Sequence, residues 1–232
     1  MNKYFVIGDV HGCYEKLVAL LKSWNPKEEK LIFLGDLIDR GTGSLEVVQL
    51  AIKLVKEYDA VVIRGNHEEL FINWLLYPET ETEVYLAQGG DKTAASFTGI
   101  KDIYQYSSEY LTRHILENFI EEASFLEDLP FYYYDDSYIF VHAGIDTDKI
   151  DWKKTREHDF CWIRERFYSR PNETNHTIIF GHTPTRKLNV DKSHDVWVSP
   201  CKTKIGIDGE ACAGGRLHAL RIHGKNIKII SA

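Results

Sequence analysis

The first third of the chain alternates short apolar runs with longer amphipathic stretches. Three runs are apolar and partly β-branched, which predicts buried strands, and they lie at residues 4–7, 31–34 and 60–63. Between them, apolar side chains recur with the spacing of one helix face, at residues 17, 20, 21 and 24 and again at 45, 48, 52 and 55. Asn25-Pro26 would end the first helix, and Ser44 would cap the second. This order of strands and helices predicts a parallel sheet covered by helices.

The rest of the chain is first helical and then rich in strands. Residues 70–76 and 107–126 are predicted helices, and the acidic stretch 80–82 is a predicted surface loop. Beyond residue 130, short apolar runs predict a hairpin of 131–134 with 138–141, followed by strands at 177–180, 204–207, 217–222 and 227–230. No repeat or linker divides the chain. We therefore predict one domain over residues 1–232, an α/β sandwich of two mixed sheets flanked by helices.

Composition narrows the class of protein. The 232 residues carry 28 Lys and Arg against 35 Asp and Glu, a formal net charge of −7, which argues against binding nucleic acid through bulk positive charge. No window approaches the ~18 consecutive apolar residues of a membrane helix, and the first residues lead into a predicted strand without the features of a signal peptide. The four cysteines form no CxxC pair and are expected to be reduced thiols. We expect a cytoplasmic protein whose partners include neither nucleic acid nor membrane.

Polar side chains follow five of the predicted strands at the point where each strand ends. The loops are Gly8–Gly12, Gly35–Gly41, Gly65–Glu68, His142–Gly144 and Gly181–Thr183. Because ligands of α/β sheets gather outside the carboxyl ends of the strands, we expect these loops to meet. The candidate metal ligands in them are Asp9, His11, Asp36, Asn66, His142 and His182. Carboxylate, amide oxygen and imidazole without cysteine suit manganese, iron or zinc.

Each of these residues has an ordinary explanation when it is taken singly. A turn or a helix cap explains an aspartate after a strand, and a hydrogen-bonded place in the core explains a histidine. Asp39-Arg40 could equally form a surface ion pair. What favours a shared site is the recurrence of such residues after five separate strands.

The combined motifs resemble a known family. GDVHG, GDLIDRG, GNHE, HAG and GHT, spread over residues 4–184, resemble the phosphoprotein phosphatase family of calcineurin-like metallophosphoesterases. Gly12-Cys13-Tyr14 and the WIRER segment at 162–166 look most like the small bacterial and bacteriophage Ser/Thr protein phosphatases. The resemblance implies a metallophosphoesterase sandwich with two divalent metal ions, manganese first, with iron and zinc as alternatives. The resemblance also implies which residues hold each ion. Asp9 and His11 would bind the first metal, and Asp36 would bridge the two. The second metal would be bound by Asn66, His142 and His182.

The resemblance also implies a catalytic set. His67 would be the general acid that protonates the leaving alkoxide, and Asp39 would orient it and raise the pKa of its imidazole. Arg40 would bind the phosphate with its planar guanidinium. Arg164 matches a second phosphate-binding arginine, although Arg166 is close enough to be confused with it, and a solvated helix charge explains either one.

The implied function is that of a dinuclear-metal phosphoesterase, a Ser/Thr protein phosphatase that hydrolyses phosphate monoesters with metal-activated water. Its substrate would be a phosphorylated protein or a small phosphoester. The alternatives are a symmetrical dinucleoside tetraphosphate hydrolase and a broad phosphoesterase. The former group resembles this chain but lacks the aspartate seen at Asp39 and has Asp in place of Glu68. A non-catalytic binding protein would be expected to have lost a ligand, the acid or an arginine, and all are present here.

Two further stretches resemble family segments near the site. Gln88-Gly89-Gly90 resembles a segment near the substrate pocket, and a loop between helices is the alternative interpretation. Asp208 would lie in a Gly-rich turn near the site without being catalytic. The sequence specifies neither the physiological substrate nor the oligomeric state.

Overall fold

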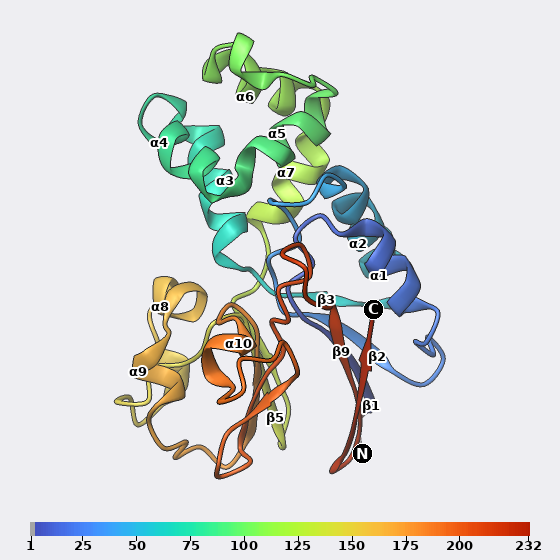
Figure 1. The fold of residues 1–232 in the computed structure, drawn as a ribbon, viewed down its shortest axis with the longest axis vertical. Helices are drawn as coiled ribbons and strands as arrows, with labels where there is room; N and C mark the ends of the chain where they lie inside the picture. Colours follow the sequence, from blue (N-terminus) through green and yellow to red (C-terminus); the bar gives the residue numbers. More distant parts are fainter. Residues whose placement is uncertain (1–2) are drawn as a thin grey trace.

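The computed structural model describes residues 3–232, and two five-stranded sheets face each other in it (Figure 1). The first sheet has the order β10-β9-β1-β2-β3. Its strands are β1 (Lys3–Ile7), β2 (Lys30–Phe33), β3 (Val61–Val62), β9 (His218–His223) and β10 (Asn226–Ser231). β1, β2 and β3 are parallel, as the pattern of the first third predicts, while β9 pairs antiparallel with both β1 and β10.

The second sheet has the order β4-β5-β6-β8-β7. Its strands are β4 (Tyr132–Tyr134), β5 (Tyr138–Val141), β6 (Thr177–Phe180), β7 (Trp197–Val198) and β8 (Lys204–Gly206). β5, β6 and β8 are parallel, and β4 forms the predicted hairpin with β5. Side chains of both sheets, among them Val6, Phe140 and Ile179, form a buried core between them. The predicted sandwich of two mixed sheets is confirmed.

Helices cover the outer faces of both sheets. The first sheet is covered by α1 (Tyr14–Leu21) and α2 (Ser44–Tyr58), whose apolar faces pack on Phe5 and Phe33. Shorter helices cover the second sheet (Figure 1), and these are α8 (Glu157–Trp162), α9 (Glu165–Tyr168) and α10 (Thr185–Leu188). No helix within residues 3–232 is long and apolar enough to cross a membrane.

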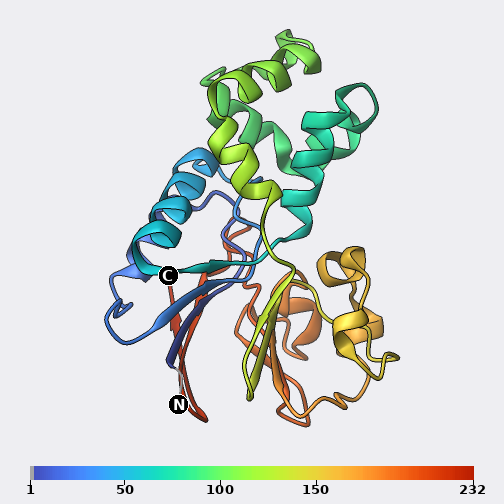
Figure 2. The ribbon, with the colours of Figure 1, turned by 180° about the vertical axis from the view of Figure 1, so that it is seen from behind.

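A group of helices, here called the helical cap (residues 66–127), sits on one end of the sandwich (Figures 1 and 2). It consists of α3 (Asn66–Leu76), α4 (Pro78–Tyr85), a π-helical turn (Leu86–Gly90), α5 (Asp91–Thr98), α6 (Ser108–Asn118) and α7 (Ile120–Glu127). Its centre is aromatic, with Phe71, Trp74, Tyr85 and Phe97 in contact. The strands β1, β2 and β3 end toward this cap.

Four predictions of local structure are wrong. Asn25-Pro26 does not end the first helix, because α1 already ends at Leu21. Residues 80–82 lie inside α4, which begins with Pro78 at a position where proline suits a helix, with acidic residues in its first turn. The predicted helix 107–126 is two helices, because Phe119 leaves helical geometry at φ −135°. Ser44 is the first residue of α2, and its hydroxyl accepts a hydrogen bond from the Asp39 backbone instead of capping the helix.

Candidate metal centre

The five polar loops meet at the end of the sandwich beneath the helical cap. Asp9, Asp36 and Asn66 follow β1, β2 and β3, which run parallel, so these residues leave the first sheet at one edge. His142 and His182 follow the parallel strands β5 and β6 of the second sheet. The structure therefore brings together the loops that the sequence analysis singled out.

Two groups of ligand atoms are close enough to hold a cation. Donor atoms of His11, Asp36 and His67 lie within 4.8 Å of one another, and so do those of Asp36, His142 and His182. Asp36 belongs to both groups, the geometry expected of a bridging carboxylate. Its Oδ2 lies 3.5 Å from His11 Nε2 and its Oδ1 lies 3.4 Å from His142 Nε2. The first group contains His67 where the sequence analysis expected Asp9.

Asp9 and Asn66 complete the cluster from either side. Asp9 Oδ2 accepts a hydrogen bond from the His182 backbone N–H at 2.9 Å, but its Oδ1 is buried without a hydrogen-bond partner. Asn66 Oδ1 lies 3.1 Å from His142 Nε2 and 2.8 Å from His182 Nδ1. A buried carboxylate oxygen normally has a hydrogen-bond donor, and this one has none. Its place next to several imidazole rings is what a site for a bound cation would show.

The electrostatics of the cluster are those of a site that needs positive charge. Burial raises the pKa of Asp9 and of Asp36, and neighbouring carboxylates raise each further. Burial lowers the pKa of His11 and His182, and lowers the pKa of His142 to about 3. Neutral imidazoles and clustered carboxylates are the forms that bind divalent metals. The donor set therefore fits the two divalent ions that the motifs imply.

The site loops hold unusual backbone conformations. Five residues other than glycine have positive φ there, at His11 (47°), Asp36 (50°), Asp39 (71°), Arg40 (67°) and His182 (58°). This left-handed conformation is uncommon for such residues and tends to collect at functional sites. The strain is compensated by local contacts, one of which comes from Glu68: its carboxylate accepts hydrogen bonds from the backbone of Asp36, Leu37 and Gly65.

His67 and Asp39 form a buried pair. Asp39 Oδ2 lies 2.7 Å from His67 Nδ1, and both side chains are almost fully buried. Burial raises the pKa of Asp39 to about 7. The pKa of His67 is lowered by burial and by the nearby charges of Arg40 and Arg164. This direction is opposite to the one expected from a carboxylate neighbour alone.

The predicted arginines divide between the site and the surface. Arg40 donates to His11 Nε2 at 2.6 Å and to His67 Nε2 at 2.9 Å, so its guanidinium lies at the centre of the cluster. Arg164 donates to the backbone oxygen of His182 at 2.9 Å. Arg166 points elsewhere and pairs with Asp146 at 2.7 Å. Between the two candidates, Arg164 is therefore the arginine at the site.

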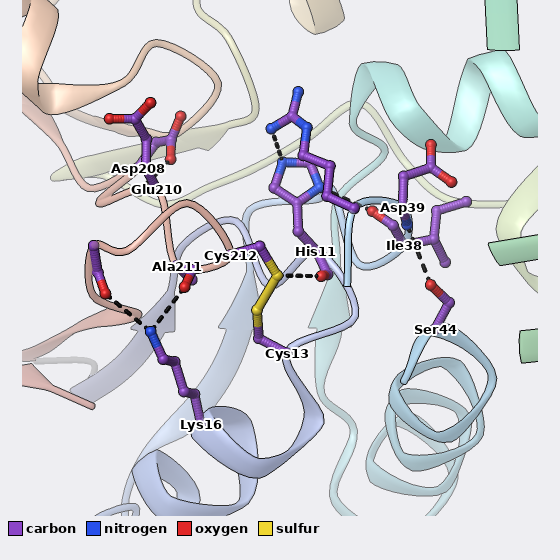
Figure 3. The surroundings of a disulfide bond; sticks show 12 residues. His11, Cys13, Lys16, Ile38, Asp39, Ser44, Asp208, Glu210, Ala211 and Cys212 are labelled. Atoms are coloured by element: carbon purple, nitrogen blue, oxygen red, sulfur yellow. Dashed lines mark hydrogen bonds between the residues drawn. A yellow bond between two sulfur atoms is a disulfide. The ribbon is translucent and has the colours of Figure 1, made fainter. Parts of the chain in front are cut away.

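Figure 3 shows a disulfide bond beside the first loop of the site, where the sequence predicts only reduced thiols. Cys13 and Cys212 are disulfide-bonded in the structure, so that expectation is wrong for this pair, while Cys161 and Cys201 are free. Cys212 Sγ also touches the backbone oxygen of His11 at 2.8 Å. Since the two cysteines are 199 residues apart, no local spacing signals their pairing.

The same C-terminal loop brings Asp208 to the site. Asp208 is buried, and its charge contributes to the raised pKa of Asp9. Lys16 of α1 holds the loop by donating to the backbone oxygens of Ala211 and Gly215 at 2.7 and 2.9 Å (Figure 3).

A family model described as calcineurin-like phosphoesterase matches residues 3–209. The chain belongs to this family. The resemblance in the motifs is thereby confirmed, and the protein is a metal-dependent phosphoesterase.

Two kinds of bacterial relative resemble this phosphoesterase in sequence. An asymmetrical bis(5'-nucleosyl)-tetraphosphatase, PrpE, of Halalkalibacterium halodurans is 27% identical over 242 residues, covering 94% of this chain and 89% of the relative. Serine/threonine-protein phosphatase 1 of Salmonella typhimurium is 28% identical over 195 residues, covering 79% of each chain. The relatives thus carry two different substrate classes in their names.

Solved structures confirm the fold of this phosphoesterase. A putative diadenosine tetraphosphatase superposes with a TM-score of 0.68 at 19% identity, covering the whole of this chain and 94% of that one. A cold-active protein tyrosine phosphatase superposes with a TM-score of 0.67 at 16% identity, covering the whole of this chain and 78% of that one. At these identities the likeness concerns the fold alone.

Proposed function

We propose that this phosphoesterase is a Ser/Thr protein phosphatase, which removes phosphate from serine and threonine side chains. The observation that carries the proposal is the buried Asp39–His67 pair. A serine or threonine alkoxide is a strongly basic leaving group, so its departure needs a proton from a positioned acid. A nucleotide leaving from a polyphosphate is a much weaker base and has little need of one. The presence of a positioned Asp39–His67 pair therefore favours a phosphomonoester over a nucleoside polyphosphate as the substrate.

The other groups of the site have complementary roles in this proposal. Asp9, His11, Asp36, Asn66, His142 and His182 would hold two divalent ions, for which we propose manganese, with iron or zinc as alternatives. When bound, the ions would supply the charge that activates water and neutralises phosphate. Arg40 and Arg164 would bind the non-bridging phosphate oxygens, over which negative charge spreads in the transition state. As Arg40 turns to the phosphate, it frees His67 Nε2 to carry the proton for the leaving group.

The second candidate is hydrolysis of a dinucleoside tetraphosphate. Supporting it is the PrpE relative, which aligns with 94% of this chain. The two candidates use the same metal and arginine groups and differ in the leaving group. The substrate of the second would be a small anionic nucleotide in place of a phosphorylated protein.

A side-by-side rate measurement separates the candidates. The ratio of kcat/KM for a phosphothreonine peptide and for diadenosine tetraphosphate would be measured in Mn²⁺ buffer. A preference for the peptide supports the proposal, and a preference for the nucleotide overturns it. Chromatography of the nucleotide products adds the cleavage pattern: two ADP for symmetrical cleavage, ATP and AMP for asymmetrical cleavage. A preparation stripped of metal and assayed in buffer without added metal serves as the control and should be inactive on both.

The role of His67 has its own test. His67→Asn is expected to lower kcat on an alkyl phosphate by about 10²–10⁴-fold, the usual contribution of a general acid. Loss on an aryl phosphate should be much smaller, because a phenolate leaves without a proton. Metal content measured by mass spectrometry should stay the same. Equal losses on both substrates would show that His67 is not the acid.

A further inference from the structure

The carboxylate of Asp39 is held by the helical cap as well as by His67. Its Oδ2 faces His67, while its Oδ1 accepts hydrogen bonds from the Tyr85 hydroxyl at 2.8 Å and from Thr93 Oγ1 at 2.6 Å. Asp39, Tyr85 and Thr93 are completely buried. No motif in the sequence points to Tyr85 or Thr93.

Thr93 and Ser44 also hold the backbone of Asp39. The Asp39 N–H points to Thr93 Oγ1 at 2.8 Å and to Ser44 Oγ at 3.2 Å, and the second of these is drawn in Figure 3. The two hydroxyl oxygens are 2.9 Å apart. Thr93 has a single hydroxyl proton and gives it to the carboxylate, so Ser44 is the donor between the two hydroxyls. Thr93 thus forms hydrogen bonds with both the side chain and the main chain of Asp39.

The π-helical turn explains why two cap residues reach the same carboxylate. It lies between α4, where Tyr85 is the last residue, and α5, which carries Thr93. Its Gly89 carbonyl also accepts a hydrogen bond from the Arg40 N–H at 3.0 Å. Here the turn supports Asp39 and Arg40, both of which have positive φ.

We propose that Tyr85 and Thr93 are positioning residues that hold Asp39 in the orientation that makes His67 an effective acid. The inference rests on the proposed function of the Asp39–His67 pair. With Oδ1 fixed by two hydroxyl donors, Oδ2 stays directed at His67 Nδ1. The imidazole is then fixed with Nε2 toward Arg40 and the metal ligands. Neither hydroxyl touches the substrate, and both act through Asp39.

The test uses the dependence of rate on the leaving group. Tyr85→Phe keeps the ring that stacks on Trp74 and removes only the hydroxyl. Thr93→Val removes the other donor at equal size, and Thr93→Ser restores it. We expect Tyr85→Phe and Thr93→Val each to lower kcat on a phosphothreonine peptide roughly tenfold or more, as expected for loss of a hydrogen bond to a charged group. Their kcat on an aryl phosphate should change little, and Thr93→Ser should resemble the unaltered protein.

Controls separate positioning from folding and from failure of the acid assignment. Tyr110→Phe, at an exposed position of the same cap, should leave both rates unchanged. If Tyr85→Phe and Thr93→Val lower both rates equally, or lower neither, the positioning role is wrong. If His67→Asn itself shows no difference between leaving groups, the proposed acid has failed instead. Should Tyr85→Phe fail to fold, the pair Thr93→Val and Thr93→Ser decides the question alone.

Discussion

Arg164 and Arg166 lie two positions apart and face different surroundings. Arg164 reaches the backbone of His182, close enough to the site for its charge to affect the pKa of His67. Arg166 is half exposed and pairs with Asp146. Their spacing alone does not separate them, because which one faces the site depends on the bend between α8 and α9.

This contrast leads to a prediction with a matched control. Arg164→Lys is expected to lower kcat/KM on a phosphothreonine peptide by roughly 10–100-fold, because lysine cannot bind two phosphate oxygens with one planar group. Arg166→Lys should leave kcat/KM within about twofold, since surface ion pairs contribute ~1 kcal/mol or less and lie outside the site. Steady-state kinetics of the two variants measure this. Equal effects of the two changes would contradict the assignment.

The two free cysteines should differ sharply in reactivity. Hydrogen bonds from Ser199 and Thr203 lower the pKa of the exposed Cys201 to about 7, whereas burial raises the pKa of Cys161. The thiolate is the reactive form, so alkylation of Cys201 by iodoacetamide should rise with pH and reach half its maximal rate near pH 7. Ser199→Ala should move that midpoint to higher pH. Peptide mass spectrometry over a pH series measures both, and a midpoint near pH 8.5 in the unaltered protein would contradict it.

At the residue scale, the motifs predict which polar side chains the fold brings together. Asp36 and His142 could be selected because polar residues recur after five separate predicted strands, although each has an ordinary explanation when it is taken singly. Tyr85 and Thr93 could not, because a tyrosine and a threonine in helices are usually core or surface residues. Their role depends on which loop the cap meets, and that is decided by packing between distant segments.

The π-helical turn is the element that most clearly escapes prediction. Its first residues, Leu86-Ala87, fit an ordinary helix, and Gln88-Gly89-Gly90 equally fits a loop. Gly89 has φ 97°, and a Cβ built there would lie 2.9 Å from both Cγ and N of Arg40. Glycine is therefore required by the conformation and by the contact. The longer helices are predictable because the spacing of their apolar residues persists over several turns. The strands are predictable because each is a short apolar run that ends in a Gly-containing loop.

Gly89→Ala and Gly99→Ala form an instructive pair. Both glycines have positive φ, so each change is expected to destabilise the protein by ~1–2 kcal/mol. A Cβ at Gly99 meets nothing within 4 Å, whereas one at Gly89 displaces Arg40. Only Gly89→Ala should also lower kcat, roughly tenfold or more, because small misplacements of catalytic groups are costly. Thermal unfolding and kinetics together measure this, and similar kcat values in both variants would contradict it.

At the scale of the whole molecule, the order of strands and the placement of loops in the sequence predict the sandwich. They do not predict the long-range disulfide. Pairing Cys13 with Cys212 closes almost the entire chain. In the chain-entropy model such a loop stabilises the folded state by up to about 5 kcal/mol. Each kcal/mol corresponds to roughly 2–4 °C in Tm at this size.

Reduction should therefore lower the Tm by up to about 10–20 °C. A thermal melt with and without a phosphine reductant measures the shift, and Cys161→Ser, which leaves the bridge intact, should show the same shift. Cys13→Ser should melt at the lower temperature in both conditions. Titration of thiols in the denatured, unreduced protein should count two free thiols, and a count of four would show that the bridge is absent.

The place of β1 in the first sheet has a consequence for biosynthesis. β1 lies between β2, the next strand made, and β9, which ends at residue 223. At ~5–20 residues per second, translation leaves one edge of β1 without its final partner for roughly 10–40 s. Open apolar edges invite pairing with other chains. Synthesis of this protein thus passes through a window in which its first strand needs protection, and chaperone demand should fall abruptly once β9 emerges.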